Sequence, residues 1–405
     1  MQLRRIGLFS CLSLLTMVRI TSSKLVKKKR SLFYRISAWL HLWLGLVTGI
    51  VVVIVSITGA ILTFEEELRY LFQPYQHAES QERSFLPPSV LAESVKKEYQ
   101  VPGVSAVIYR GEGRTAVVPW YGDRKNLLVN FVDPYTGKPV HSQKLDDDFY
   151  RIMIIGHYQL WLPRKIGKPV VAYSTLIFVI TLITGMVLWW PKKWTKRSRD
   201  QSFLIRVKSS FKRLNYDLHN VLGFYSLLVA LILALTGMVY GMEWFNNAVY
   251  WTASGGKKFE YTRLMSDTTL TQVSDHAEDD ILFSRLKKTG VDLDYEHITI
   301  GYPFGKAGTW SVSVNPKPGT RYLETRDQFE QHSLKLLNSE VPYSEANGEE
   351  QLRRINYDLH VGSIGGLTTK IIAFLVCVIS ASLPITGLIV WLGKKKKSKK
   401  KPTLT

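Results

Sequence analysis

The sequence is poor in cysteine, because its 405 residues include only Cys11 and Cys377. Cys11 lies in the N-terminal tail and Cys377 inside a long apolar stretch, so no disulfide bond is expected between them. The chain also lacks a C-x-x-C-H motif, which excludes covalent attachment of haem by the usual route. It has no nucleotide-binding fingerprint either, so NAD(P)H or flavin would have to be bound by a separate protein.

Asp, Glu, Lys and Arg are missing from four long apolar runs. Each run approaches or exceeds the ~20 residues that a helix needs to cross a bilayer. A buried helix of a soluble protein is the alternative for any single run, but four runs with charged flanks predict an integral membrane protein. The runs are Trp39–Phe64, Val170–Trp190, Val221–Tyr240 and Ile371–Leu392.

The net charge of +20 is concentrated in three short stretches beside these runs, which hold 21 Lys and Arg but a single acidic residue. Such clusters mark the cytoplasmic side of the membrane. We therefore expect both termini in the cytoplasm and two long segments, about 66–155 and 244–355, outside the cytoplasmic membrane. No basic face or reading motif accompanies the charge, so the expected partner is the lipid bilayer and not nucleic acid. The stretches are Lys24–Arg30, Lys192–Arg213 and Lys394–Lys401.

The two halves of the chain repeat one another. The first run contains "LHLWLG" and the third begins within "LHNVLG", and in both the histidine precedes a Thr-Gly pair by 17 residues. The second and fourth runs also contain Thr-Gly, preceded at 27 and 26 residues by His157 and His360. We therefore expect two half-units, each built as span, outer segment, span. Helix packing is a sufficient explanation for the four Thr-Gly pairs, because small residues let helices approach closely.

The two outer segments have the patterns of small α+β modules. Short strands are expected at "VSAVIYR", "TAVVPWYG" and "LLVNFVDPYTGKPV" in the first, and at "HITIGYP" and "TWSVSVNPKPGTRYLE" in the second. Helices are expected at Ser89–Tyr99 and Asp279–Gly290. The predicted fold class is an α-helical membrane protein, a four-span bundle built as an internal repeat, with two small α+β domains outside the membrane.

Four histidines lie in or beside the spans at matched distances from Thr-Gly. The expected topology places His41 and His219 near the cytoplasmic side and His157 and His360 near the outer side. Two facing imidazoles can provide the two axial ligands of a haem iron, whereas a zinc site requires three or four ligands from the protein. We therefore predict two haem b groups, one bound by His41 and His219 and the other by His157 and His360.

Residues around the histidines fit the same interpretation. Gly45 follows His41 by four residues, and Gly223 follows His219 by the same distance. Residues four apart lie on the same helical face, so a glycine there, which has no Cβ, would leave room for a flat macrocycle beside the histidine. Close packing of helices is the alternative explanation for these glycines. The pentapeptide "NYDLH" ends at His219 and again at His360. Its Asn and Tyr are expected to reach the other ring nitrogen, or simply to start a helix at a membrane surface.

The chain resembles the PepSY-associated transmembrane proteins. The resemblance rests on "LHLWLG", the repeated Thr-Gly pairs, "LWWPKK" and above all "FVDPYTGKPV" (Phe131–Val140), and it covers about residues 30–395. It implies an iron-regulated inner-membrane protein similar to di-haem ferric-siderophore reductases, with the four membrane histidines as haem ligands. The outer modules would then be PepSY-like domains, and the second lacks a clear copy of "DPYTG".

The resemblance and the charge pattern together divide the chain into segments. A start of translation at Met17 is an alternative within the first segment. The segments are a cytoplasmic N-terminal tail (1–30), transmembrane helix 1 (31–65), a first PepSY-like outer domain (66–150), an outer surface segment with transmembrane helix 2 (151–191), a basic cytoplasmic loop (192–214), transmembrane helix 3 (215–243), a second PepSY-like outer domain (244–350), an outer surface segment with transmembrane helix 4 (351–393) and a basic cytoplasmic tail (394–405).

The predicted function is transmembrane electron transfer to ferric iron outside the cytoplasmic membrane, a ferric-siderophore reductase type of activity. The acceptor would be a ferric siderophore or another Fe(III) chelate, and the donor a cytoplasmic protein or quinol. One alternative is a cytochrome b subunit that passes quinol electrons to another outer-side acceptor. Another is a non-enzymatic PepSY sensor or protease-regulating membrane anchor, which leaves the spaced histidines unexplained. No catalytic residue beyond the haem ligands is singled out.

Overall fold

Four long apolar helices confirm the predicted spans of a multi-pass membrane protein, because each is long and apolar enough to cross a bilayer. The computed structural model describes residues 30–122, 127–258, 264–269 and 277–399. Most of the predicted N-terminal tail, with its alternative start at Met17, therefore lies outside the described residues, as do the last six residues. The spans are α1 (Leu32–Thr63), α5 (Arg164–Trp189), the continuous segment of α7 (Phe211–Asp217), η3 (Leu218–Leu222) and α8 (Gly223–Gly241), and α12 (Leu367–Lys399).

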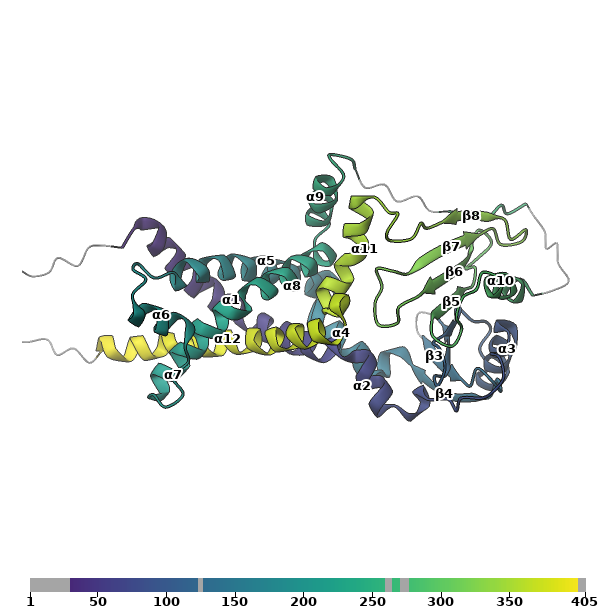
Figure 1. The fold of residues 1–405 in the computed structure, drawn as a ribbon, viewed down its shortest axis with the longest axis horizontal. Coiled ribbons are helices and arrows are strands. Elements are labelled where there is room, and N and C mark those ends of the chain that lie inside the picture. The colour runs from purple at the N-terminus through teal and green to yellow at the C-terminus, as the bar shows by residue number, and fades with distance from the viewer. Residues whose placement is uncertain (1–29, 123–126, 259–263, 270–276, 400–405) are drawn as a thin grey trace, which may run out of the picture.

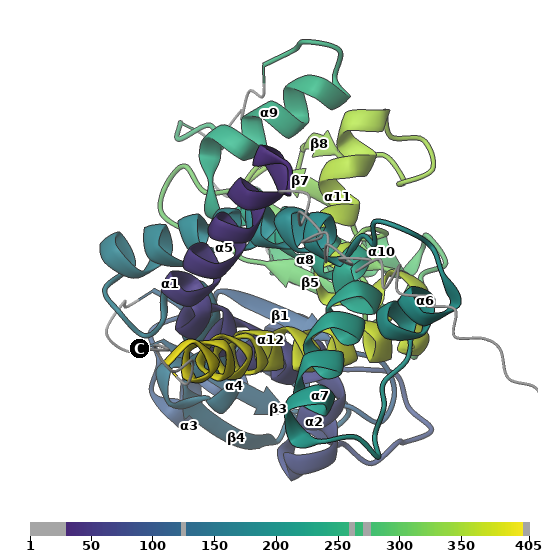
Figure 2. The ribbon, with the colours of Figure 1, turned by 90° about the vertical axis from the view of Figure 1, so that its left-hand side faces the viewer.

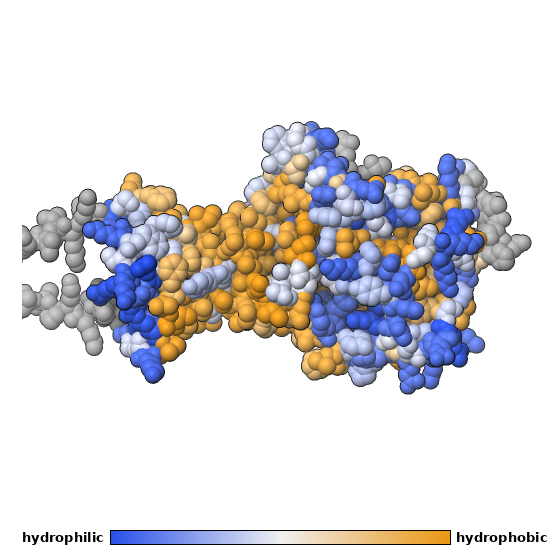
Figure 3. Space-filling view, in the orientation of Figure 1, coloured by the Kyte–Doolittle hydropathy of each residue, from blue (hydrophilic) through white to orange (hydrophobic). Residues whose placement is uncertain are grey.

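The four spans pack as a ring in the order α1, α5, α8, α12 (Figure 1 and Figure 2). A Cβ on Gly49 of α1 would lie 3.2 Å from Cβ of Pro384 in α12, so the missing side chain lets these helices approach closely. Figure 3 shows an apolar band around the bundle between two hydrophilic ends. Such a band is the surface that a helical bundle presents to lipid.

The described parts of the basic stretches share one end of the bundle. The start of α1, α6 (Lys196–Phe203) and the end of α12 all lie opposite the sheet in Figure 1. Basic residues gathered at one end of a bundle are the arrangement that the positive-inside rule describes.

Spans two and four are each preceded by a shorter, separate helix. α4 (Phe149–Gln159) ends where Leu160 and Trp161 take φ angles of 56° and 55°. α11 (Gly348–Val361) ends at Gly362, whose φ is 79°. Left-handed residues end the helical hydrogen bonding and turn the chain, so both helices are oriented independently of the spans. Two further helices are α2 (Glu65–Phe72) and α9 (Glu243–Ala253), which the sequence did not predict.

One eight-stranded antiparallel sheet lies at the other end of the bundle (Figure 1), in the order β4-β3-β2-β1-β5-β6-β7-β8. The sequence predicts two small outer domains, but β1 pairs with β5, Ala106 opposite Gly301, and joins both segments in one sheet. This pairing satisfies the backbone groups that two separate sheets would leave exposed at their edges. The strands are β1 (Ala106–Tyr109), β2 (Ala116–Trp120), β3 (Leu128–Val132), β4 (Pro139–Lys144), β5 (His297–Gly301), β6 (Trp310–Asn315), β7 (Thr325–Phe329) and β8 (Leu336–Ser339).

Two helices cover one face of the sheet, α3 (Pro88–Tyr99) and α10 (Glu278–Lys287), close to their predicted positions. They share one apolar core with strand residues of both outer segments, Val107 among them. Side chains alternate along a strand. Ile108 and Arg110 therefore project from the opposite face, toward the membrane helices.

The turn between β7 and β8 copies the turn between β3 and β4. Asp133 accepts hydrogen bonds from the backbone N–H groups two and three residues later, and Glu330 does the same in the second turn. Leu334 has a φ of 53° at the position where Gly137 has a φ of 72°. The second outer segment therefore forms a turn of the same geometry as "DPYTG" from a different amino-acid sequence.

Candidate functional site

Each of the four membrane histidines rests on a Thr-Gly pair of a neighbouring helix. His41 of α1 lies against α5, with Nδ1 3.0 Å from the carbonyl oxygen of Thr181 and 3.5 Å from Oγ1 of Thr184. A Cβ on Gly185 would lie 3.0 Å from Cε1 of the same ring, so the absence of a side chain admits the imidazole. We call such a set of one carbonyl, one Thr hydroxyl and one glycine a histidine seat.

His157 of α4 occupies a seat on α1. Its Nδ1 lies 2.9 Å from the carbonyl oxygen of Val55 and 3.2 Å from Oγ1 of Thr58. A Cβ on Gly59 would lie 3.0 Å from Cε1 of the ring. α1 therefore both carries one of the four histidines and receives another.

The second half of the chain contains two matching seats. His219 lies on α12 and His360 of α11 lies on α8. For both rings, Nδ1 is 3.0–3.1 Å from a carbonyl oxygen and from a Thr hydroxyl, and a Cβ on the glycine would lie 3.1 Å from Cε1. The seat residues are Leu383, Thr386 and Gly387 for His219, and Leu233, Thr236 and Gly237 for His360.

The seats bring the histidines together in two pairs. The ring centroids of His41 and His219 are 6.1 Å apart with their planes at 79°, and those of His157 and His360 are 6.0 Å apart at 61°. Two metal–nitrogen bonds of about 2 Å, together with the two ring radii, span about 6 Å. Each pair therefore has the separation at which two imidazoles can share one metal ion.

The hydrogen bonds of the seats define which ring nitrogen faces a metal. A backbone carbonyl oxygen can only accept, so Nδ1 of each ring carries the hydrogen and Nε2 the lone pair. Burial, together with the neighbouring His360, lowers the pKa of His157 to about 4, and burial also lowers the pKa of His360. Both outer rings are therefore neutral at neutral pH, the state in which an imidazole binds a metal.

The donor set of each pair fits haem iron. In the part of the chain that the structure describes, no group of three or more His, Cys, Asp or Glu side chains could hold a metal ion. Each pair offers two nitrogen ligands, which a porphyrin-bound iron requires because the macrocycle supplies the others. The role of these histidines as haem ligands stays a prediction.

The Asn of each "NYDLH" copy bonds the seat and not the ring. Asn215 donates from Nδ2 to the carbonyl oxygen of Thr386, 3.0 Å away, in the seat of His219. Asn356 donates in the same way to the carbonyl oxygen of Thr236, at 3.3 Å. The expected hydrogen bond from Asn to the ring nitrogen is therefore wrong for both copies, because the seat helix provides the partners of Nδ1.

The aspartates of "NYDLH" are completely buried and fasten neighbouring loops. Asp217 accepts hydrogen bonds from the backbone N–H of Arg206, in the loop before α7, at 3.3 Å, and from Nε of Arg213 at 3.1 Å. Asp358 accepts from the backbone N–H groups of Arg321, at 3.1 Å, and Tyr322, at 2.8 Å. Each copy of the pentapeptide thus holds a histidine, a seat and a loop together.

The Thr-Gly pairs are the functional residues that sequence reasoning missed. Helix packing was a sufficient explanation for each pair alone, yet every pair receives a histidine ring. Their recurrence in all four runs was the signal that could have found them. A second unpredicted feature is η3, a π-helical turn (Leu218–Leu222) at His219, and such turns often occur at functional sites.

The two glycines predicted to make room for a macrocycle contact neighbouring helices. A Cβ on Gly45 would lie 3.7 Å from Cγ2 of Thr181, and one on Gly223 would lie 3.6 Å from Cδ2 of Leu383. Both partners belong to histidine seats. These contacts fit the alternative of close helix packing, and contact with a macrocycle stays a prediction.

Comparison with known proteins gives one family. The sequence profile described as PepSY-associated TM region matches residues 38–394. That range contains the four histidines, their seats and the whole sheet. No curated protein matches the chain.

Proposed function

The chain belongs to the PepSY-associated transmembrane family, and we propose that it is a di-haem oxidoreductase that passes electrons across the cytoplasmic membrane to ferric iron on the outer side. The acceptor is Fe(III) held by a siderophore or another chelate. The observation that carries this proposal is the pairing of four seated histidines, with ring centroids 6.1 and 6.0 Å apart. A membrane anchor without a cofactor would have no use for two such pairs.

Four residues hold the two haem b groups in this proposal, His41 with His219 and His157 with His360. When bound, haem supplies reversible one-electron transfer. The carbonyl and hydroxyl oxygens of each seat accept the Nδ1 hydrogen, which fixes the orientation of the ring and raises the basicity of Nε2. The apolar helices around the pairs exclude water from the ligands.

The internal repeat and the two PepSY-like domains are part of the same proposal. Each half of the chain contains two histidine seats of the same composition. Each half also adds four antiparallel strands, one covering helix and one carboxylate turn, at Asp133 or Glu330. Duplication of one span–domain–span unit accounts for all of these recurrences.

The proposed orientation places the sheet outside and both termini in the cytoplasm. The basic residues gathered at the end opposite the sheet support it. The donor is then a cytoplasmic protein or a membrane quinol, because the chain has no nucleotide-binding fingerprint of its own.

Haem content and absorbance of the purified protein test the proposal. We expect a reducible b-type Soret band, two haems per chain, and loss of one haem in each single His→Ala variant. The losses should group by pair, so that His41→Ala matches His219→Ala, and His157→Ala matches His360→Ala. His141→Ala is the matched control, because His141 lies in β4, away from the bundle. Protein without a Soret band would overturn the proposal, and reduced protein that ferric siderophores do not reoxidise would exclude them as acceptors.

A further inference from the structure

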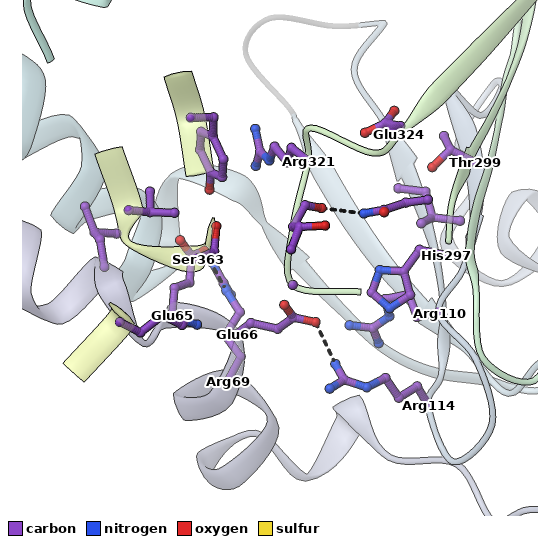
Figure 4. A pocket seen from close by; sticks show the side chains of 18 of the residues that line it. Glu65, Glu66, Arg69, Arg110, Arg114, His297, Thr299, Arg321, Glu324 and Ser363 are labelled. Carbon is purple, nitrogen blue, oxygen red and sulfur yellow. Dashed lines mark hydrogen bonds and ion pairs between the residues drawn. The ribbon is translucent and has the colours of Figure 1, made fainter. Parts of the chain in front are cut away.

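A polar cavity separates the sheet from the ends of the membrane helices. Its volume is about 370 Å³, within the range of about 300–1,000 Å³ typical of small-ligand sites. The uncovered face of the sheet forms one wall, with Arg110 and Thr299, and the ends of α1, α11 and α12 form the other (Figure 4). Both outer segments and the bundle line the cavity, so it exists only in the complete fold.

Positive charge predominates in the cavity lining. Two of the carboxylates already have cationic partners, since Glu66 lies 3.4 Å from Nη1 of Arg114 and Glu65 lies 2.9 Å from Nη2 of Arg69. The charged lining residues are Arg69, Arg110, Arg114, Arg321 and Lys370 against Glu65, Glu66 and Glu324. Arg69 and Lys370 also pair with carboxylates outside the lining, Asp148 and Glu67, each at 2.5 Å. The positive charge that remains for a ligand therefore rests on Arg110 and Arg321.

Two arginines of the lining form no ion pair with any carboxylate that the structure describes. The guanidinium of Arg110 donates to the uncharged oxygens of Thr115 and Gln76. The guanidinium of Arg321 lies 3.9 Å above the ring of Tyr357. Both groups therefore keep their charge available for an anion in the cavity.

Arg110 is buried beside another positive charge, and a bound anion would stabilise its protonated guanidinium. Burial, with the neighbouring charge of Arg114 as a further cause, lowers the pKa of Arg110 to about 9. An opposite charge nearby stabilises a protonated guanidinium and acts against both causes. An anionic ligand would thus stabilise the cavity while it binds.

The cavity borders the helices that hold His157 and His360. Val361, which lines the cavity, directly follows His360 in α11. Leu62, also in the lining, lies one turn beyond Gly59, on which His157 is seated. The cavity therefore borders the helix turns that hold these two histidines, and neither imidazole is among its lining residues.

We propose that this cavity binds anionic Fe(III) chelates whose periphery carries carboxylate groups. The iron in this statement rests on the proposed function, whereas the preference for anions follows from the lining. Arg321 pairs with a carboxylate of the chelate, because its planar guanidinium matches a carboxylate with two hydrogen bonds. Arg110, whose nitrogens already donate to Thr115 and Gln76, contributes its positive charge. Neutral and cationic chelates lack these pairings and bind more weakly.

Binding of a redox-inert chelate tests this proposal without electron transfer. The probe is the Ga(III)–citrate complex, which resembles ferric citrate in charge and shape, titrated by calorimetry into the purified, haem-loaded full chain. We expect Arg321→Gln to weaken binding about tenfold, the loss of one charge-assisted contact. Arg321 is exposed, so its replacement leaves the core intact. Arg114→Gln should act in the same direction.

Lys288→Gln is the matched control. It removes one positive charge from an exposed position just after α10, on the covered side of the sheet. We expect this variant to bind the probe like the wild type, and all variants to keep the wild-type Soret spectrum.

Three results would overturn the proposal. They are wild-type affinity in both Arg321→Gln and Arg114→Gln, equally tight binding of citrate without metal, and equally tight binding of a neutral Ga(III) trihydroxamate. Failure of the site and failure of the proposed function are distinguishable. If haem-loaded protein does not bind the probe, the proposed chelate site is refuted and the proposed function is not. If the purified protein contains no haem, the proposed function is refuted, whether or not the probe binds.

Discussion

An imidazole that must bind a metal at a fixed angle needs a second attachment, because its ring otherwise rotates about two side-chain bonds. In all four seats this attachment is a backbone carbonyl oxygen 2.9–3.1 Å from Nδ1. Each carbonyl belongs to a helix other than the one that carries the histidine. At the scale of single residues, the ring orientation is thus determined by helix packing, and small changes in the seats should alter the metal site.

Removal of one seat hydroxyl should weaken the proposed haem site that it supports. Oγ1 of Thr386 lies 3.0 Å from Nδ1 of His219, whereas Oγ1 of Thr184 lies 3.5 Å from Nδ1 of His41. Valine keeps the shape of threonine but cannot accept a hydrogen bond. We expect Thr386→Val to lower haem affinity at the inner pair about 10–100-fold, and Thr184→Val to have a smaller effect, since 3.5 Å is a weak hydrogen bond. Haem retention and redox titration measure both, and equal effects would contradict this account.

A methyl group in a seat should displace the ring. A Cβ on Gly387 would lie 3.1 Å from Cε1 of His219, whereas a Cβ on Gly393, in the same helix, would meet nothing within 4 Å. We therefore expect Gly387→Ala to shift the spectrum of the inner haem and lower its occupancy. Gly393→Ala is the control and should leave haem content unchanged. Unaltered spectra in both variants would show that the close contact at Gly387 has no influence on the ligand.

At the scale of elements, the outer histidines depend on two short helices that are separate from the spans. α4, which carries His157, is capped by Asp148, whose carboxylate accepts from the N–H of Arg151 at 2.9 Å. The same carboxylate pairs with both terminal nitrogens of Arg69 in α2, at 2.8 and 2.5 Å. α2 directly follows span α1, so this ion pair fixes α4 relative to the seat of its histidine.

Loss of this carboxylate should therefore affect the outer pair alone. Asp148→Ala removes the helix cap, worth about 1 kcal/mol, and leaves the partly buried Arg69 without one of its partners. We expect lower thermal stability and loss of the outer haem, with the spectrum of the inner haem retained. Asp146→Ala is the control, because its carboxylate is exposed and lies 4.0 Å from Arg151. Simultaneous loss of both haems would indicate general unfolding and refute a local role.

At the scale of the whole molecule, α4 and α11, which carry His157 and His360, lie at the end of the bundle next to the sheet, whereas α7, which leads into the turn with His219, lies toward the other end (Figure 1). Because β1 and β5 pair, the two strand-bearing segments form one continuous sheet, which provides one wall of the cavity. Their shared core, which includes Leu91 and Leu282, adds to this coupling. The part of the molecule that carries the strands is therefore a single sheet with one core and not two independent modules.

The proposed orientation predicts which residues a membrane-impermeant reagent can reach. Lys288, in the outer part, and Lys208, between α6 and α7, are both exposed. In right-side-out vesicles we expect a cysteine in place of Lys288 to react with an impermeant maleimide, and a cysteine in place of Lys208 to react only after permeabilisation. The parent chain, with its own two cysteines, provides the background. The reverse pattern would invert the topology and place the sheet in the cytoplasm.

The sequence by itself determined the elements whose signals are local. The four spans follow from long runs without charge, and α3 and α10 follow from helical periodicity, because both properties are carried by neighbouring residues. The matched spacing of the histidines from Thr-Gly also indicated that all four have one kind of role. Their grouping into two levels followed from the charge pattern of the loops.

Only the tertiary structure decided which helix receives each histidine and that the two outer segments share one sheet. The partners in a seat are far apart in the chain, 140 residues for His41 and Thr181, and such contacts leave no periodicity in the sequence. β7 and β8, with mixed polar sequences such as "TRDQF", form strands because an existing sheet offers them hydrogen-bonding partners. The cationic cavity likewise joins strands, loops and helix ends from both halves of the chain, so only the folded chain could reveal it.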